Sequence, residues 1–295
     1  MALPRFPALS AALLTLALAG PVALAAEDAA QSTRAYVETS YLIAPKRIGE
    51  FTLVQTRFDP DNKYAGPGFR YQAESHPDFR VDVYVYPAGR MGQAEAMSTG
   101  MEAFRSQLDQ AVAAEMYSDL VVQEAPFAFA QESTLQSTPE PDPDDPFAAS
   151  IIAANLASSH PEGRKLSMTL QLKPEDAPAY SAGYLMYRQL YYFKLRASAL
   201  QSQIDAEQFH AFADRAALTL LPAIEAAHVG DCANATLTVD PGAPSGEVLQ
   251  ALITQSSEQL GYNCHQSAEA AGISGKSAEA DLVTIHYEPH EWRAQ

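Results

Sequence analysis

The chain has 295 residues and a formal net charge of −17 at pH 7, with 36 acidic and 19 basic side chains. This excess of negative charge repels nucleic acid and anionic lipid, so partners of those kinds are not expected. The hydrophobic fraction of 47% is ordinary for a globular fold.

The N-terminal residues have the three parts of a secretory signal. A single charge, Arg5, precedes an apolar run over residues 8–20. The sequence Ala23-Leu24-Ala25 then places small residues at a cleavage site, so cleavage near Ala25 is expected. An uncleaved membrane anchor is the alternative. Because no later stretch is apolar for long enough, we expect a mature periplasmic or secreted protein without a membrane span.

The first half of the chain predicts strands followed by a helix. Residues 50–86 predict a three-stranded meander, in which alternate valines of FRVDVYVYP share one face. Residues 92–117 carry apolar side chains at helical spacing, and residues 120–123 predict a short strand. An acidic, proline-rich loop over 137–146 and a short helix over 147–158 are expected next.

The second half repeats this order. Residues 165–172 predict one strand, and residues 184–198 predict a second, long strand. In the long strand Tyr191, Phe193, Leu195 and Ala197 are expected to be buried, and the residues between them are expected to face outward. Asp205 is expected to begin a helix whose apolar stripe ends at Ile224.

The segment 229–295 differs in character and predicts a separate subdomain of βαβ type. A strand over 233–239, a helix over 247–260 and a strand over 282–287 are expected. Cys232 and Cys264 are the two cysteines of the chain, and an even number in an exported protein predicts a disulfide. Two free buried thiols are the alternative. Residues 26–228 would then form the main domain.

The order of elements predicts an α+β fold, a mostly antiparallel sheet packed with helices as an α/β sandwich. The small disulfide-tied C-terminal subdomain would be added to it. Over residues 49–227 the paired strands FTLVQTRF and FRVDVYVYP, the helix after them, the strand YYFKLRAS and the helix EQFHAFADRAALTLLPAI occur in turn. In this order the chain resembles the PsbP-like and DcrB-like periplasmic α/β/α sandwich proteins. The resemblance implies an accessory or binding protein without catalytic residues.

Six residues on the outward faces of two strands predict a binding surface. They combine tyrosine with basic side chains: Arg80, Tyr84, Tyr86, Tyr192, Lys194 and Arg196. Tyrosine and arginine are enriched at recognition surfaces because they offer a large contact area with a polar tip. The alternative is that helices cover these faces or that they are ordinary solvated sheet.

Metal and nucleotide motifs are weak. His286, Glu288 and His290 could together bind zinc or copper, with a solvated tail as the alternative. The acids of the 137–146 loop could bind calcium, but a solvated loop is the expected reading. Residues 270–277 depart from a phosphate-binding loop at Ala270, so we expect a flexible linker and no cofactor.

No nucleophile motif is found in the sequence, so no catalytic residue is predicted. We therefore expect an exported, non-catalytic protein that binds a protein or envelope component, and its acidity would suit a basic partner. One form of this reading is an inhibitor or immunity protein against an exported toxin. An envelope hydrolase and a metal-binding protein are the alternatives.

Overall fold

The computed structural model describes residues 34–129, 162–234 and 236–291, which belong to one compact unit. The predicted signal peptide, the proline-rich loop with its acids Asp142, Asp144 and Asp145, and the short helix over 147–158 lie outside the described residues. Among the helices of the described residues, none is long and apolar enough to cross a membrane.

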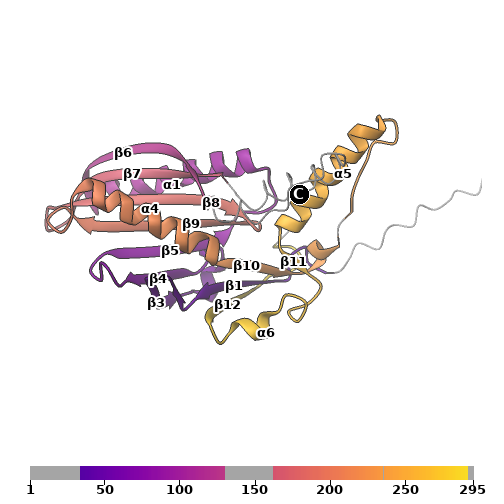
Figure 1. The fold of residues 1–295 in the computed structure, drawn as a ribbon, viewed down its shortest axis with the longest axis horizontal. Coiled ribbons are helices and arrows are strands. Elements are labelled where there is room, and N and C mark those ends of the chain that lie inside the picture. The colour runs from indigo at the N-terminus through magenta and orange to yellow at the C-terminus, as the bar shows by residue number, and fades with distance from the viewer. Residues whose placement is uncertain (1–33, 130–161, 235, 292–295) are drawn as a thin grey trace, which may run out of the picture. The chain divides into compact units, whose positions relative to one another are not determined.

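An eight-stranded antiparallel sheet is the larger of two sheets (Figure 1). Its strands, in spatial order, are β2 (Arg47–Ile48), β3 (Phe51–Arg57), β4 (Gly68–Ala73), β5 (Arg80–Pro87), β9 (Tyr191–Leu200), β8 (Ala177–Arg188), β7 (Glu162–Leu172) and β6 (Tyr117–Ala128). A short 3-10 helix, η1 (Pro60–Ala65), connects β3 to β4. The predicted meander corresponds to β3, β4 and β5.

One long helix covers each face of this sheet. On the α4 face, helix α4 (Ala206–Ala223) packs Phe209 and Phe212 in one cluster with the valines of β5 and with Phe193. On the α1 face, helix α1 (Gln93–Ala113) packs Met101 and Phe104 over β7 and β8. The predicted α+β sandwich is therefore confirmed. Asp205 also caps α4 as expected, since its side chain accepts a hydrogen bond from the Gln208 amide.

Two glycines allow α1 to approach the sheet closely. A Cβ atom added to Gly183 on β8 would lie 2.4 Å from Cζ of Phe104. A Cβ atom added to Gly100 on α1 would lie 2.6 Å from Cε1 of Tyr192. Neither position has room for a side chain, so both glycines set the distance between helix and sheet.

The long strand expected over 184–198 is wrong. The chain reverses at Gln189 and Leu190, whose φ angles are 50° and 62°, and forms a hairpin of β8 and β9. Two-residue hairpin turns of this kind usually contain asparagine or glycine, and neither is present here. The buried face of β9 was predicted correctly, because Tyr191, Phe193, Leu195 and Ala197 are all buried.

A second, four-stranded sheet joins the two ends of the described chain. Its order is β11 (Cys264–His265), β10 (Glu225–Val229), β1 (Thr39–Pro45) and β12 (Ala280–His286). Strand β1 is antiparallel to both neighbours, whereas β10 and β11 are parallel and are connected through α5 (Ser245–Gly261). The segment after residue 228 therefore shares its sheet with an N-terminal strand that the sequence pattern did not predict.

The disulfide between Cys232 and Cys264 is confirmed, with Cα atoms 5.8 Å apart. It ties η2 (Asp231–Ala233) to β11. The helix expected over 247–260 and the strand expected over 282–287 correspond to α5 and β12. A short helix, α6 (Ile273–Lys276), precedes β12. The strand expected over 233–239 is not formed, because its described residues after η2 are exposed and have no regular structure.

Candidate functional site

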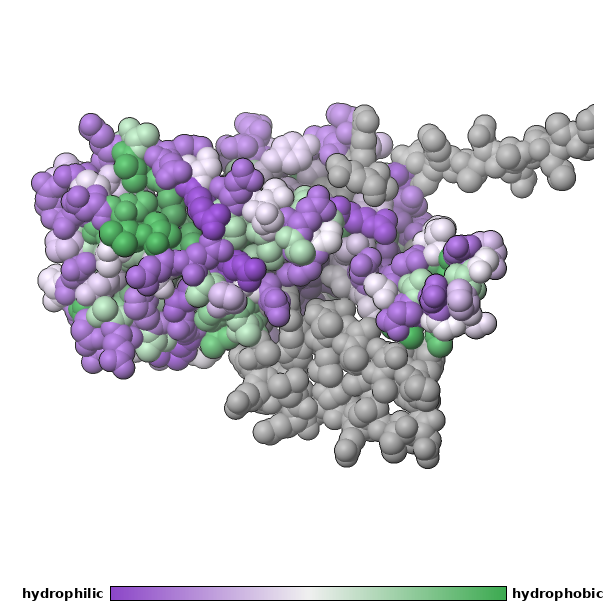
Figure 2. All heavy atoms as spheres, turned by 90° about the horizontal axis from the view of Figure 1, so that it is seen from above, coloured by the Kyte–Doolittle hydropathy of each residue, from purple (hydrophilic) through white to green (hydrophobic). Residues whose placement is uncertain are grey.

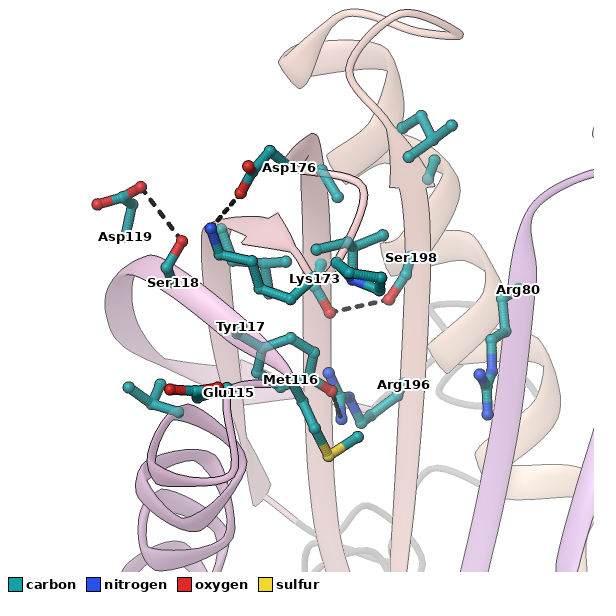
Figure 3. Close-up of a pocket in the computed structure, with 18 of the residues that line it drawn as sticks. Arg80, Glu115, Met116, Tyr117, Ser118, Asp119, Lys173, Asp176, Arg196 and Ser198 are labelled. Atoms are coloured by element: carbon teal, nitrogen blue, oxygen red, sulfur yellow. Dashed lines mark hydrogen bonds and ion pairs between the residues drawn. The ribbon is translucent and has the colours of Figure 1, made fainter.

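A pocket of about 1270 Å³ opens on the α1 face of the large sheet, beyond the C-terminal end of α1. Its floor comes from β5, β9, β8 and β7. Its walls come from residues 115–119, which lead from α1 into β6, and from the hairpin between β7 and β8 (Figure 3). This volume is at the upper end of what small-molecule sites need and would accommodate a short stretch of peptide.

Arg196 is the principal polar group of the pocket. It lies on β9, and its Nη1 donates a hydrogen bond of 3.2 Å to the hydroxyl of Tyr117 at the start of β6. Its guanidinium carbon lies 5.7 Å from the centroid of the same ring. Within ranges 34–129, 162–234 and 236–291 no carboxylate forms an ion pair with Arg196. Its neighbour across β5 and β9 is Asp82, whose two carboxylate oxygens are engaged by other arginines.

The other cations of the pocket are paired. Asp82 is buried, and its two carboxylate oxygens accept from Arg70, at 2.8 Å, and from Arg80. Lys173 forms an ion pair with Asp176 within the β7–β8 hairpin (Figure 3). The basic side chains other than Arg196 are thus occupied by carboxylates.

Three acids at the pocket have no cationic partner among the residues that the structure describes. They are Asp78, Glu115 and Asp119. Asp119 accepts a hydrogen bond of 3.4 Å from Ser118. Arg196, which has no ion pair in the described ranges, is thus surrounded by carboxylates without cationic partners. This distribution of charge favours a ligand that has one negative group and is neutral or positive elsewhere.

The wall beside α1 is apolar and exposed. Val112 and Met116 line the pocket and are 39% and 54% exposed. On β6, Val122 lies on the same face as α1 and is 39% exposed, whereas Val121, at 58%, points to the opposite face. Figure 2 looks down on the β6 side and shows a compact green patch there, surrounded by hydrophilic residues. Exposed apolar clusters with a polar surround often mark binding sites.

The structure divides five of the six predicted surface residues into two groups, and the sixth, Tyr86, belongs to neither. Arg80, Tyr84 and Arg196 line the pocket. Tyr192 and Lys194 are buried beneath α1, with 6% and 8% exposure, so the expectation that they face solvent is wrong. The covered-face alternative applies to these two residues.

Hydrogen bonds to α1 satisfy the polar groups of these two buried side chains. The Tyr192 hydroxyl donates to the carbonyl of Ala96 at 2.7 Å, and Lys194 Nζ donates to Gln107 Oε1 at 2.6 Å. Tyr86 is half-buried, with its ring centroid 5.4 Å from that of Tyr192.

Lys194 is a buried cation held by aromatic rings. Its Nζ lies 4.9 Å from the ring centroid of Phe104, 5.4 Å from that of Tyr84 and 5.6 Å from that of Tyr86. Burial, together with the positive charge of Arg196, lowers the pKa of Lys194 to about 8. Tyr84 therefore separates a buried cation from the pocket.

One serine–histidine pair occurs elsewhere, between the two sheets. The Oγ of Ser40 lies 2.8 Å from Nδ1 of His228, and both residues are fully buried. Because Nε2 of His228 lies 2.6 Å from the carbonyl oxygen of Gln189, Nε2 must donate and Nδ1 accepts from the serine. Since no solvent reaches either side chain, the pair has a structural role and not a catalytic one.

The histidines and acid proposed as metal ligands are not brought together. In the described part of the chain no group of three or more histidine, cysteine or acidic side chains could hold a metal ion. The Nδ1 of His286 lies 3.1 Å from the hydroxyl of Thr39 on the neighbouring strand. Glu288 and His290 are exposed. The nearby Glu291 pairs with Lys63 at 2.7 Å.

Sequence reasoning missed the residues that come from turns and from the far side of the pocket. Tyr117 follows the end of a helix, and Lys173 lies in a turn, so neither belongs to a periodic pattern. Ser181 lies in β8, which the sequence did not predict at that position.

In comparisons with known proteins, no family model and no curated protein sequence matches this chain.

Proposed function

We propose that the protein is an exported, non-catalytic binding protein that captures a protein partner in the α1-face pocket. The observation that supports this most is the combination of Arg196, an arginine without an ion pair in the described structure, with an adjoining exposed apolar wall. A charged group with an apolar neighbourhood can fix the orientation of a ligand and supply its binding energy. The order of elements over residues 49–227, which resembles periplasmic binding sandwiches, is in keeping with this proposal.

The arrangement of side chains favours binding over hydrolysis. The serine–histidine pair at Ser40 is sealed from solvent. In the pocket both oxygens of the buried Asp82 carboxylate are engaged by arginines, so they are not free to contact a ligand. The free acids lie at the walls. Among the described residues that line the pocket, Ser118 donates to the carboxylate of Asp119 at 3.4 Å, but no histidine is present to act with them.

Export is supported by two features. The disulfide between Cys232 and Cys264 is of a kind that persists in oxidising compartments. The first 25 residues have the composition of a removable signal. Expression of the full chain in a bacterial host, fractionation, and mass spectrometry should find a periplasmic species that starts near residue 26 and has no alkylatable thiol. A full-length, cytoplasmic species with two free thiols would contradict export.

Pull-down from envelope extract tests the binding function. Three baits should be compared. They are the wild-type protein, the variant Ser198→Trp, which fills the pocket, and the control Arg57→Gln, which replaces an exposed arginine on β3. We expect a partner, identified by mass spectrometry, that wild type and Arg57→Gln retain and that Ser198→Trp and the double variant Tyr84→Ala/Arg196→Ala lose. Equal retention by all baits with equal melting temperatures would place binding elsewhere.

A further inference from the structure

The α1-face pocket has the features of a site for a chain end. We infer that it recognises the free C-terminal carboxylate of a peptide segment whose last residues are apolar. This inference rests on the proposed binding function and specifies the ligand of the same pocket. Arg196 would bind the carboxylate, and the wall of Val112 and Met116 would bind the side chains next to it.

Arg196 has hydrogen-bonding capacity left for a carboxylate. A guanidinium carries five N–H donors, and Nη1 uses one of them on Tyr117. Ser198 lies two residues further along the same strand on the same face, with its hydroxyl 3.0 Å from that of Ser181. Ser181 donates its hydroxyl to the carbonyl of Ala197, so Ser198 donates to Ser181. The donors for a carboxylate at the floor therefore come from the forked guanidinium of Arg196.

The charges of the pocket favour one negative group and disfavour several. The remaining basic residues of the pocket are paired with Asp82 or Asp176, and the free acids Asp78, Glu115 and Asp119 repel a second negative charge. A phosphate group or an acidic peptide would meet this repulsion, whereas a terminal carboxylate followed by neutral or basic residues would not. The net charge of −17 acts in the same direction.

The polar lining favours a peptide over a fatty acid. An alkyl chain in the pocket would remove water from the hydroxyls of Tyr84 and Ser198 without offering hydrogen bonds in return, which costs free energy. A peptide backbone supplies donors and acceptors at regular intervals. The apolar surface over Leu170, Leu172 and Met116 matches the alternate side chains of an extended segment.

Affinity selection from two peptide pools tests this inference. Randomised hexapeptides with free C-termini and the same pool with amidated C-termini are passed over immobilised full-length protein, and the retained peptides are sequenced by mass spectrometry. We expect retention from the free pool with apolar last residues, and about tenfold or greater loss when the carboxylate is amidated. Sodium decanoate serves as the fatty-acid probe and should not displace the retained peptides at equal concentration.

Variants assign the effect to Arg196. Arg196→Gln should lower retention of the free pool to that of the amidated pool, whereas Arg57→Gln should leave the preference unchanged. Because Arg196→Gln could disturb folding, Tyr117→Phe is a second variant, and removal of this positioning hydroxyl should weaken the preference while melting stays at the wild-type temperature. Equal retention of the two pools, retention of neither, or displacement by decanoate would overturn the inference.

The outcome is separable from that of the proposed function. If envelope capture is lost in Ser198→Trp but is insensitive to Arg196→Gln, the pocket binds a partner without reading its carboxylate. If capture is unaffected by Ser198→Trp, the binding function itself fails at this site.

Discussion

The hydroxyl groups of Tyr191 and Tyr287 lie 2.6 Å apart in the interior of the protein. Tyr191 begins β9 of the large sheet, and Tyr287 directly follows β12 of the small one. Both side chains are buried, so this hydrogen bond replaces water at a point where the two sheets meet. The ring of Tyr191 also stacks on His228, with centroids 5.2 Å apart.

Removal of one of these hydroxyls should destabilise the protein. Tyr191→Phe and Tyr287→Phe should each lower the free energy of unfolding by about 1–2 kcal/mol, because the other hydroxyl loses a partner in a dry environment. The double variant should cost less than the sum, since the two hydroxyls bond each other, although Ser40, which interacts with both, remains. Urea unfolding at pH 7 measures these values. Additive costs would show that the two hydroxyls are not coupled.

Stability should depend on pH through His228. Burial lowers its pKa to about 4, from about 6.5 in the unfolded chain. Between these values the unfolded chain binds a proton that the folded chain does not, so stability falls as pH decreases from 6.5 to 4. The loss amounts to about 3 kcal/mol for a shift of this size.

His228→Asn should flatten this dependence, whereas His290→Asn, at an exposed position, should not. Urea unfolding at half-unit steps between pH 7 and pH 4 gives the slopes. Burial also lowers the pKa values of His210 and His265, so a smaller slope of the same sign should remain. An unchanged slope in His228→Asn would contradict this assignment.

Lys194→Met should stabilise the protein by about 1 kcal/mol at pH 7. The substitution removes a charge that is buried without an ion pair among the described residues, and methionine is of similar length. Because the pKa of Lys194 is lowered, the wild type gains stability as pH rises from 8 toward 10.5, and the advantage of the variant should shrink over this window. Thermal unfolding at pH 7 and pH 10 checks both statements. A variant less stable than wild type at pH 7 would show that the aromatic rings and Gln107 outweigh desolvation.

Gly183→Ala should cost about 1–3 kcal/mol, because its methyl group would overlap the ring of Phe104. Phe104→Leu in the same chain should recover part of this loss. Gly100→Ala should also destabilise, although alanine in a helix usually gains up to about 1 kcal/mol, because the new Cβ would meet Tyr192 and Leu185. Chemical unfolding of the single and double variants measures these changes in the free energy of unfolding. A more stable Gly100→Ala would mean that the helix shifts at little cost.

The sequence predicted the parts of the fold that depend on periodicity. β5 alternates valine with polar residues, and α4 combines an apolar stripe with an Asp205 cap, so both were found. The hairpin at Gln189 was missed because its turn residues are not the usual ones. β1 was missed because its burial comes from pairing with β10 and β12, which are remote in the chain.

The candidate site was predicted in part. Arg80, Tyr84 and Arg196 were identified because they lie on one face of paired strands, and strand register follows from alternation. The position where α1 ends on that face decides which of the six residues remain accessible, and no local pattern encodes it. Tyr117 and Lys173 enter the pocket only through turns, so no periodic pattern in the sequence indicates them.

The central place of β1 in the small sheet constrains the order of folding. Leu42 of β1 is paired with Val283 of β12, near the opposite end of the chain. During synthesis β1 leaves the ribosome long before its partner exists, so the small sheet cannot close until β12 has been made. Contacts at such sequence separation form slowly. The small sheet therefore stays open while the residues between its first and last strands are being synthesised.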